Sequence, residues 1–176
     1  MVEAQALVEG LGEEEFNWRP GAGEWSVEEC VAHLTMVGHV ELGHIEHAID
    51  GARARGLTGS GPFEYSAIER FILRETEPPV RHAMPALKRF VPAHNQPLTA
   101  VMPTFFHVQR MFMLQMERAD GLDLRRVKVV TPISRFLKCS LGTTFAQAAA
   151  HERRHLAQAR RVRSRIPKGV ALPATH

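Results

Sequence analysis

Apolar residues recur along much of this chain with the three-to-four-residue spacing of amphipathic helices. The clearest stretch follows Ser26, and its apolar positions run from Val31 to Ile49. Ser26 can cap this helix, with Glu29 three residues later as its capping-box partner. The pattern therefore predicts a long helix from Ser26 to Gly51 or slightly beyond.

The same spacing predicts further helices on both sides of this one. We expect a short first helix over about 1–16, a short helix over 63–74, a strong helix from Phe105 to about 121, and a long final helix over 143–165. Prolines at positions 85, 92, 97 and 103 interrupt the middle of the chain. The run 127–132 is the only strand-like segment of note, and one such run cannot form a sheet.

Four principal helices with long connections and short extra helices predict an all-α four-helix bundle. The length of 176 residues, with 44% hydrophobic and 23% charged residues, suits one compact domain over 1–176. We expect no central sheet. Periodicity alone does not define the connectivity or the handedness of the bundle.

The composition also bears on the compartment. No stretch approaches the ~18 apolar residues that span a bilayer, and the start at Met1 lacks the basic-then-apolar order of a signal peptide. We therefore expect a cytoplasmic protein without a membrane partner. The two cysteines, Cys30 and Cys139, are isolated, and we interpret both as reduced, packed thiols.

The formal net charge of +3 is unevenly spread, because basic residues crowd the last predicted helix and the tail. They are Arg153, Arg154, Arg160, Arg161, Arg163, Arg165 and Lys168. A basic run can bind nucleic-acid phosphates, but cations also favour the C-terminus and outer face of a helix. No aromatic residues interleave with the arginines to stack bases, so we expect no nucleic-acid partner.

Two histidines of the predicted last helix, His151 and His155, lie four residues apart and so share one face, one turn apart. Such a pair could be polar surface groups. Two imidazoles so placed could also bind one metal ion, and a third from another helix, His33, would leave coordination positions open for water or substrate. Neutral imidazole suits Zn, Ni, Fe or Co about equally well.

Residues 151–155 also match H-E-x-x-H, the zinc-protease signature in which Glu152 would activate water. The context argues against this function, because no acidic third ligand follows and the longer pattern would find Gln158 and Arg161 in place of Gly and His. We favour a solvent-facing or salt-bridged Glu152 over a general base. Gln158 shares the face of His155, where ligand contact and an interhelical hydrogen bond are equally plausible.

The remaining histidines have weaker support. His44 follows His33 by eleven residues, or roughly 16 Å along a helix axis, which excludes it from the same inner shell. We assign no function to His39, His47, His82, His94 and His107. The apolar positions over 105–116 favour core packing over a substrate wall, and Trp25 is more simply an anchor of the helix start than a cover for the site.

Several ordered motifs carry a family resemblance: Phe16–Pro20, Glu24–Glu29, Val31–Leu34 and His151–Gln158. Together they resemble the DinB-like superfamily from residue 11 to residue 158. The resemblance implies a four-helix bundle that binds a divalent metal through His33, His151 and His155, with a tendency to form homodimers.

The resemblance constrains function less than fold. Some relatives are thiol-dependent transferases or isomerases that use low-molecular-weight thiols, and others are known only as damage-inducible. We expect a metal-dependent enzyme acting on a small molecule, with thiol-dependent S-transfer as the leading subclass. A metal-assisted hydrolase and a non-catalytic metal- or ligand-binding module of a stress response are the alternatives. The sequence assigns no catalytic residue beyond the metal ligands.

Overall fold

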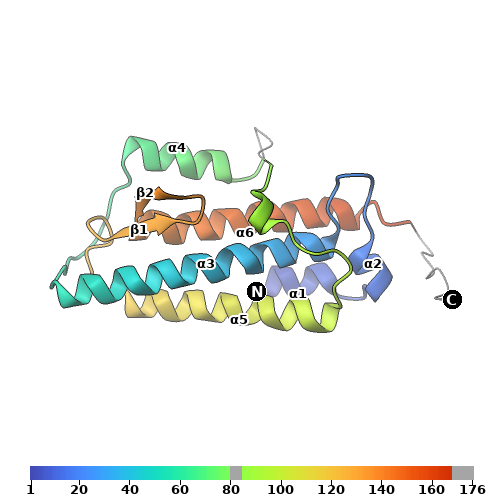
Figure 1. Cartoon of the computed structure of the whole chain (residues 1–176), viewed down its shortest axis with the longest axis horizontal. Coiled ribbons are helices and arrows are strands. Elements are labelled where there is room, and N and C mark those ends of the chain that lie inside the picture. The colour runs from blue at the N-terminus through green and yellow to red at the C-terminus, as the bar shows by residue number, and fades with distance from the viewer. Residues whose placement is uncertain (80–84, 168–176) are drawn as a thin grey trace.

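The computed structural model describes residues 1–79 and 85–167, whose long helices lie side by side (Figure 1). Its elements are α1 (Val2–Val8), α2 (Glu13–Asn17), α3 (Val27–Ala54), α4 (Ala67–Thr76), the 3-10 helix η1 (Lys88–Phe90), α5 (Leu98–Arg118), β1 (Lys128–Thr131), β2 (Ser134–Ser140) and α6 (Leu141–Arg163). In Figure 1, α3 and α5 run in one direction, and α1 and α6 run in the other. The predicted all-α bundle is confirmed.

The start of α3 follows from its first residues. The Ser26 hydroxyl accepts a hydrogen bond from the Glu29 amide at 3.1 Å, and the Glu29 carboxylate accepts one from the Ser26 amide at 2.9 Å. This reciprocal pair satisfies two amides that the helix would otherwise leave unpaired. The predicted capping box is confirmed, and α3 ends at Ala54, slightly beyond Gly51.

The predicted single helix over 1–16 is wrong in detail, because the chain forms α1 and α2 with a break between them. The break contains Gly10, whose φ of 77° lies in the left-handed region that glycine adopts without a steric penalty. The helix predicted from Phe105 begins earlier, at Leu98, and contains Pro103. That proline leaves the Thr99 carbonyl without its intrahelical donor, a local cost that the buried face of α5 offsets.

The strand-like run does have a partner, which corrects the expectation that it could not form a sheet. β1 pairs antiparallel with β2, with Lys128 opposite Ser140 and Val129 opposite Cys139. The four residues from Arg135 to Lys138 are exposed, so β2 shows no alternation of apolar and polar positions that sequence inspection would detect. This hairpin lies beside the bundle, next to α4 (Figure 1).

Buried apolar side chains form two clusters along the bundle. One joins α1 and α2 with the start of α3, the start of α5 and the end of α6. The other joins the ends of α3 and α5 with the hairpin and the start of α6. His33 and Glu41 are buried polar positions of α3. No helix in the described residues is both long and apolar enough to cross a bilayer.

Candidate metal centre

Three histidines from two antiparallel helices meet inside the bundle. His33 comes from α3, and His151 and His155 come from successive turns of α6. One ring nitrogen of each lies within 4.8 Å of the others, and the Nε2 atoms of His33 and His151 are 3.4 Å apart. Two nitrogens that share one tetrahedral ion at about 2.1 Å would also be roughly 3.4 Å apart. The donor set therefore suits a single divalent ion.

Hydrogen bonds to the far side of two rings orient their Nε2 atoms. The Nδ1 atom of His33 lies 2.7 Å from the carbonyl oxygen of Phe90, which can only accept, so Nδ1 carries the proton. The Nδ1 atom of His155 lies 3.0 Å from Oε1 of Gln158 and donates to it in the same way. Each Nε2 is left with a free lone pair, which is the arrangement that metal-binding histidines use.

Burial keeps all three imidazoles neutral. His33 and His155 are only 5% and 9% exposed. Desolvation lowers the pKa of His33, and desolvation together with the neighbouring imidazoles lowers the pKa of His151 to about 4 and that of His155 to about 2. Neutral rings can coordinate a metal at pH 7 without first losing protons.

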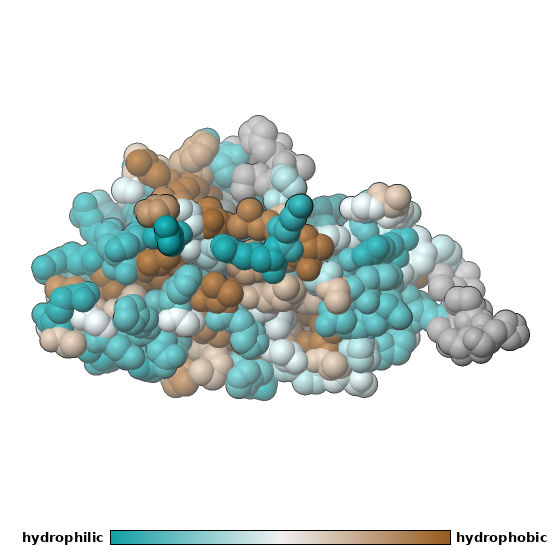
Figure 2. Space-filling model, viewed as in Figure 1, coloured by the Kyte–Doolittle hydropathy of each residue, from teal (hydrophilic) through white to brown (hydrophobic). Residues whose placement is uncertain are grey.

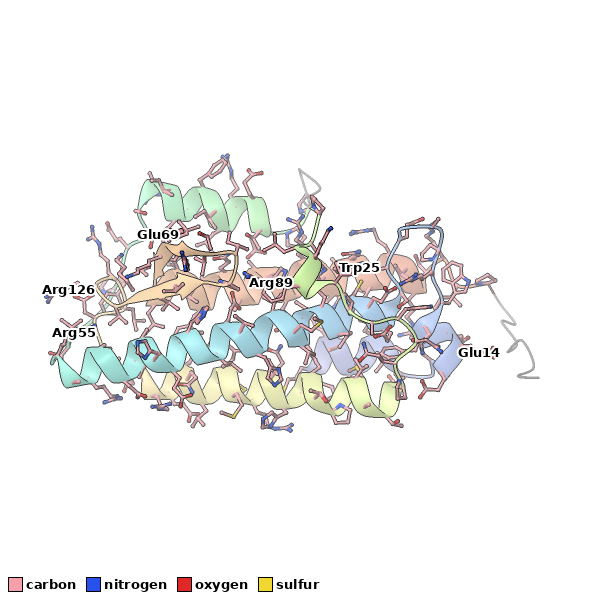
Figure 3. The ribbon with its side chains drawn as sticks, in the orientation of Figure 1. Glu14, Trp25, Arg55, Glu69, Arg89 and Arg126 are labelled. Atoms are coloured by element: carbon pink, nitrogen blue, oxygen red, sulfur yellow. The ribbon has the colours of Figure 1, made fainter. Side chains whose placement is uncertain are left out.

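Trp25 packs directly on this cluster from the segment before α3. Its ring centroid lies 4.9 Å from that of His33 and 5.8 Å from that of His155, with the latter pair stacked at 29°. Figure 3 shows Trp25 where the start of α3 meets the second half of α6. Trp25 therefore packs against one histidine of α3 and one of α6, which supports its interpretation as an anchor of the start of α3.

Glu152 is not part of the three-histidine cluster. Its Oε1 atom lies 4.0 Å from the α-amino nitrogen of Met1, and its side chain is 22% exposed. Burial raises the pKa of this carboxyl. The contact with Met1 is one of the two arrangements, solvent-facing or salt-bridged, that the sequence favours over a general base.

The other histidines lie away from the cluster or outside the described residues. The Nδ1 atom of His44 bonds to the carbonyl oxygen of Val130 at 2.9 Å, which ties α3 to β1. His39, His47 and His107 are exposed, and His82 lies outside the described residues.

A second group of possible ligands comprises Glu28, Glu29 and His94. Glu29 is already bound, because the Arg19 guanidinium donates to both of its carboxylate oxygens, at 2.7 and 2.5 Å. Gln96 donates to Glu28 at 2.8 Å. The group joins the start of α3 to the segment before α5, and Oε2 of Glu28 is buried without a hydrogen-bond partner among the described residues. Sequence inspection found only the capping role of Glu29.

Both cysteines lie in the interior of the protein. Cys30 and Cys139 are buried, and burial raises the pKa of both thiols, to about 12 for Cys30.

Several arginines of α6 and its end are bound within the chain. Arg153 pairs with Glu77, Arg160 with Glu3 and Arg165 with Glu24, while Arg163 donates to carbonyl oxygens of α1 and its C-cap.

Comparison with known proteins gives one finding. A family model described as the DinB superfamily matches residues 3–159, which include the capping box of α3 and all three clustered histidines. Comparisons with curated proteins and with solved structures gave no significant match. Because the matched region covers most of the 176 residues and has the bundle architecture described above, the chain belongs to the DinB superfamily.

Proposed function

We propose that this protein is a divalent-metal-dependent enzyme that acts on a small molecule, with His33, His151 and His155 as its metal ligands. The observation that carries the proposal is the convergence of three neutral ring nitrogens within 4.8 Å, two of them on rings oriented by hydrogen bonds at Nδ1. A divalent ion bound there would polarise a substrate oxygen or lower the pKa of a bound water or thiol. Zn, Ni, Fe and Co all suit three imidazoles.

Thiol-dependent S-transfer is the reaction we favour, with a low-molecular-weight thiol as co-substrate. The environment of the cysteines supports an external sulfur nucleophile. Cys30 and Cys139 are buried with raised pKa values, so neither presents a thiolate at neutral pH. Family membership adds support, because DinB-like relatives include thiol-dependent transferases.

Two measurements test the proposal in sequence. Metal analysis of protein purified without a histidine tag should give about one ion per chain, and metal-loaded protein should then turn over a pair of thiol and electrophile from a panel. Small thiols should bind metal-loaded protein more tightly than metal-free protein. Turnover of esters or amides without thiol binding would replace S-transfer by hydrolysis. Metal binding without any turnover would favour a non-catalytic binding module.

We also propose that the protein forms a homodimer. Exposed apolar side chains gather on α4 and the hairpin, where Figure 2 shows a hydrophobic surface crossed by a few polar side chains. The most exposed are Ile68, Phe71, Ile133 and Phe136, with 84% of Phe136 accessible. Burying this surface against a second copy would remove it from water. Light scattering should give twice the chain mass, and Phe136→Asp should shift the protein to monomers.

A further inference from the structure

A cavity of about 180 Å³ lies between α3, α5 and α6 and reaches one of the clustered histidines. Its lining from α3 and α5 is mainly apolar, and α6 contributes small residues before His151 and Glu152. Leu34, Phe112 and Met116 give it apolar walls, and Glu41, His151 and Glu152 are among its polar lining. The space would accommodate an aromatic ring or a short alkyl chain. Because Met116 is flexible and partly exposed at this wall, the cavity can adapt to its occupant.

Glu41 is the unusual member of this lining. It is 6% exposed and has no hydrogen-bond or ion-pair partner among the described residues. A carboxyl that faces a narrow cavity without a protein partner is costly, since little water remains to solvate it. Gln109 and His151 are the neutral polar side chains around the same cavity, and Glu152 adds a second acidic one. Cys139 of β2 is close enough for the Glu41 carboxylate to raise its pKa.

We infer that this cavity binds a small molecule with an apolar body and a cationic nitrogen, an amine or amidine, which pairs with Glu41. The walls supply apolar contact, and Glu41 supplies the buried polar partner that fixes orientation, as in ligand pockets generally. The cavity lining has two acidic side chains and no lysine or arginine. Apart from the metal ion proposed at His151, an anionic ligand would find no complementary charge on these side chains.

The α-amino group of Met1, which lines the cavity, lies 4.0 Å from the Glu152 carboxylate. Glu41 lies farther along α3, eight residues after His33, or roughly 12 Å along the helix axis. A ligand paired with Glu41 would therefore extend its apolar body toward His151. This inference rests on the proposed function only for the claim that the bound amine is the substrate.

A larger hollow of about 590 Å³ lies between α1 and α6, but its described lining residues offer no unpaired charged side chain to a ligand. Its charged side chains are Glu3, Arg160 and Arg163. Arg160 pairs with Glu3, and Arg163 donates to the carbonyl oxygens of Ala6 and Leu7. These groups are already satisfied within the chain, whereas Glu41 is not.

Calorimetry with benzylamine at pH 8, near the raised pKa of Glu41, tests the inference, first on metal-free protein with no tag at Met1. Benzylamine should bind, and Glu41→Gln, which keeps the shape and removes the charge, should weaken binding at least tenfold. The matched control Glu117→Gln removes an exposed carboxyl of α5 and should leave the affinity unchanged. Benzyl alcohol, the neutral probe of similar shape, should bind more weakly and equally to the wild type and Glu41→Gln.

A second variant keeps the test decisive if Glu41→Gln folds poorly. Met116→Lys places a cation at a cavity wall where the side chain is 43% exposed, and it should abolish benzylamine binding, while Met116→Leu should retain it. Equal benzylamine affinity in the wild type and Glu41→Gln, or no binding to the wild type, would overturn the inference. Metal binding without amine binding overturns this inference alone, and amine binding without metal binding overturns only the proposed metal function.

Discussion

The Nδ1 atom of His155 and the Oε1 atom of Gln158 lie 3.0 Å apart within α6, and this bond turns the opposite nitrogen of the ring toward His33 and His151. Removing the acceptor by Gln158→Leu should free the ring to rotate and to change tautomer. Outer partners of this kind are typically worth about 10- to 100-fold in metal affinity. Competition with a chromogenic chelator should therefore show a loss of this size.

A conservative variant separates this orienting role from simple packing. Gln158→Glu retains an oxygen acceptor at the same place and should restore most of the affinity that Gln158→Leu loses. If both variants bind metal as tightly as the wild type, the hydrogen bond does not orient a ligand.

The three clustered histidines should be required together for metal binding. His33→Ala removes the ligand from α3 and leaves two nitrogens on α6, so the protein should lose stoichiometric metal after dialysis. The control His47→Ala removes an exposed imidazole of the same helix and should retain full metal content. Metal analysis of both variants, with circular dichroism to confirm folding, measures this difference. Full occupancy of His33→Ala would contradict the ligand assignment.

Local signals in the sequence were sufficient for part of this site and of the fold. The spacing of His151 and His155 defines one helix face, and Ser26 with Glu29 defines the start of α3, because both depend on residues within one turn. Placing His33 beside them needed the family resemblance, since it joins segments more than a hundred residues apart. Glu41 gave no signal, because its burial arises only when α5 and α6 pack against α3.

The hairpin and the position of α4 were also missed for a physical reason. Glu69 of α4 accepts a hydrogen bond from the Ser140 amide at 3.0 Å, where β2 ends and α6 begins (Figure 3). That contact joins residues 71 positions apart, and neither has a local pattern that requires the other. The pairing of β1 with an exposed strand likewise depends on the fold and not on apolar alternation.

Loss of the Glu69 contact should loosen α4 from the bundle. Glu69 is 9% exposed, and its carboxylate also accepts from the Ser66 amide at 2.9 Å, so Glu69→Ala leaves two amides without their acceptor. A loss of about 1–3 kcal/mol in unfolding free energy is expected for the buried donor. Urea unfolding measures it, with the exposed Glu64→Ala as the control. Equal midpoints for the two variants would show that the contact contributes little.

The close approach of α3 and α5 depends on a single glycine. A Cβ atom on Gly38 would lie 2.7 Å from Cγ1 of Val108 and 3.2 Å from Cε2 of Phe112. Gly38→Ala should therefore force the helices apart and destabilise the protein by roughly 1–3 kcal/mol. Gly43→Ala on the same helix meets open space and should stabilise it by about 0.5–1 kcal/mol. The midpoint of thermal unfolding should therefore fall for Gly38→Ala and rise for Gly43→Ala.

The buried carboxyl of Glu41 should make stability depend on pH in a specific direction. Burial raises the pKa of Glu41 from 4.5 to about 8, so the folded protein retains a proton that the unfolded chain has released between these values. The folded state therefore loses stability, relative to a Glu41→Gln variant, as the pH rises from about 4.5 through 8. The limiting slope for one group is about 1.4 kcal/mol per pH unit.

Urea unfolding of the wild type and Glu41→Gln at pH 5, 6.5 and 8 measures this dependence. The unfolding free energy of the wild type, relative to that of Glu41→Gln, should be highest at pH 5 and lowest at pH 8. At pH 8 an ionised Glu41 has no partner in the cavity. Glu117→Gln, in which an exposed carboxyl is replaced, should follow the wild type at every pH. A ligand that binds only the folded state stabilises that state. If benzylamine pairs with the ionised carboxylate, adding it at pH 8 should therefore raise the unfolding free energy of the wild type toward that of Glu41→Gln. A stability difference that does not change with pH would show that Glu41 titrates normally and that the cavity does not isolate it from water.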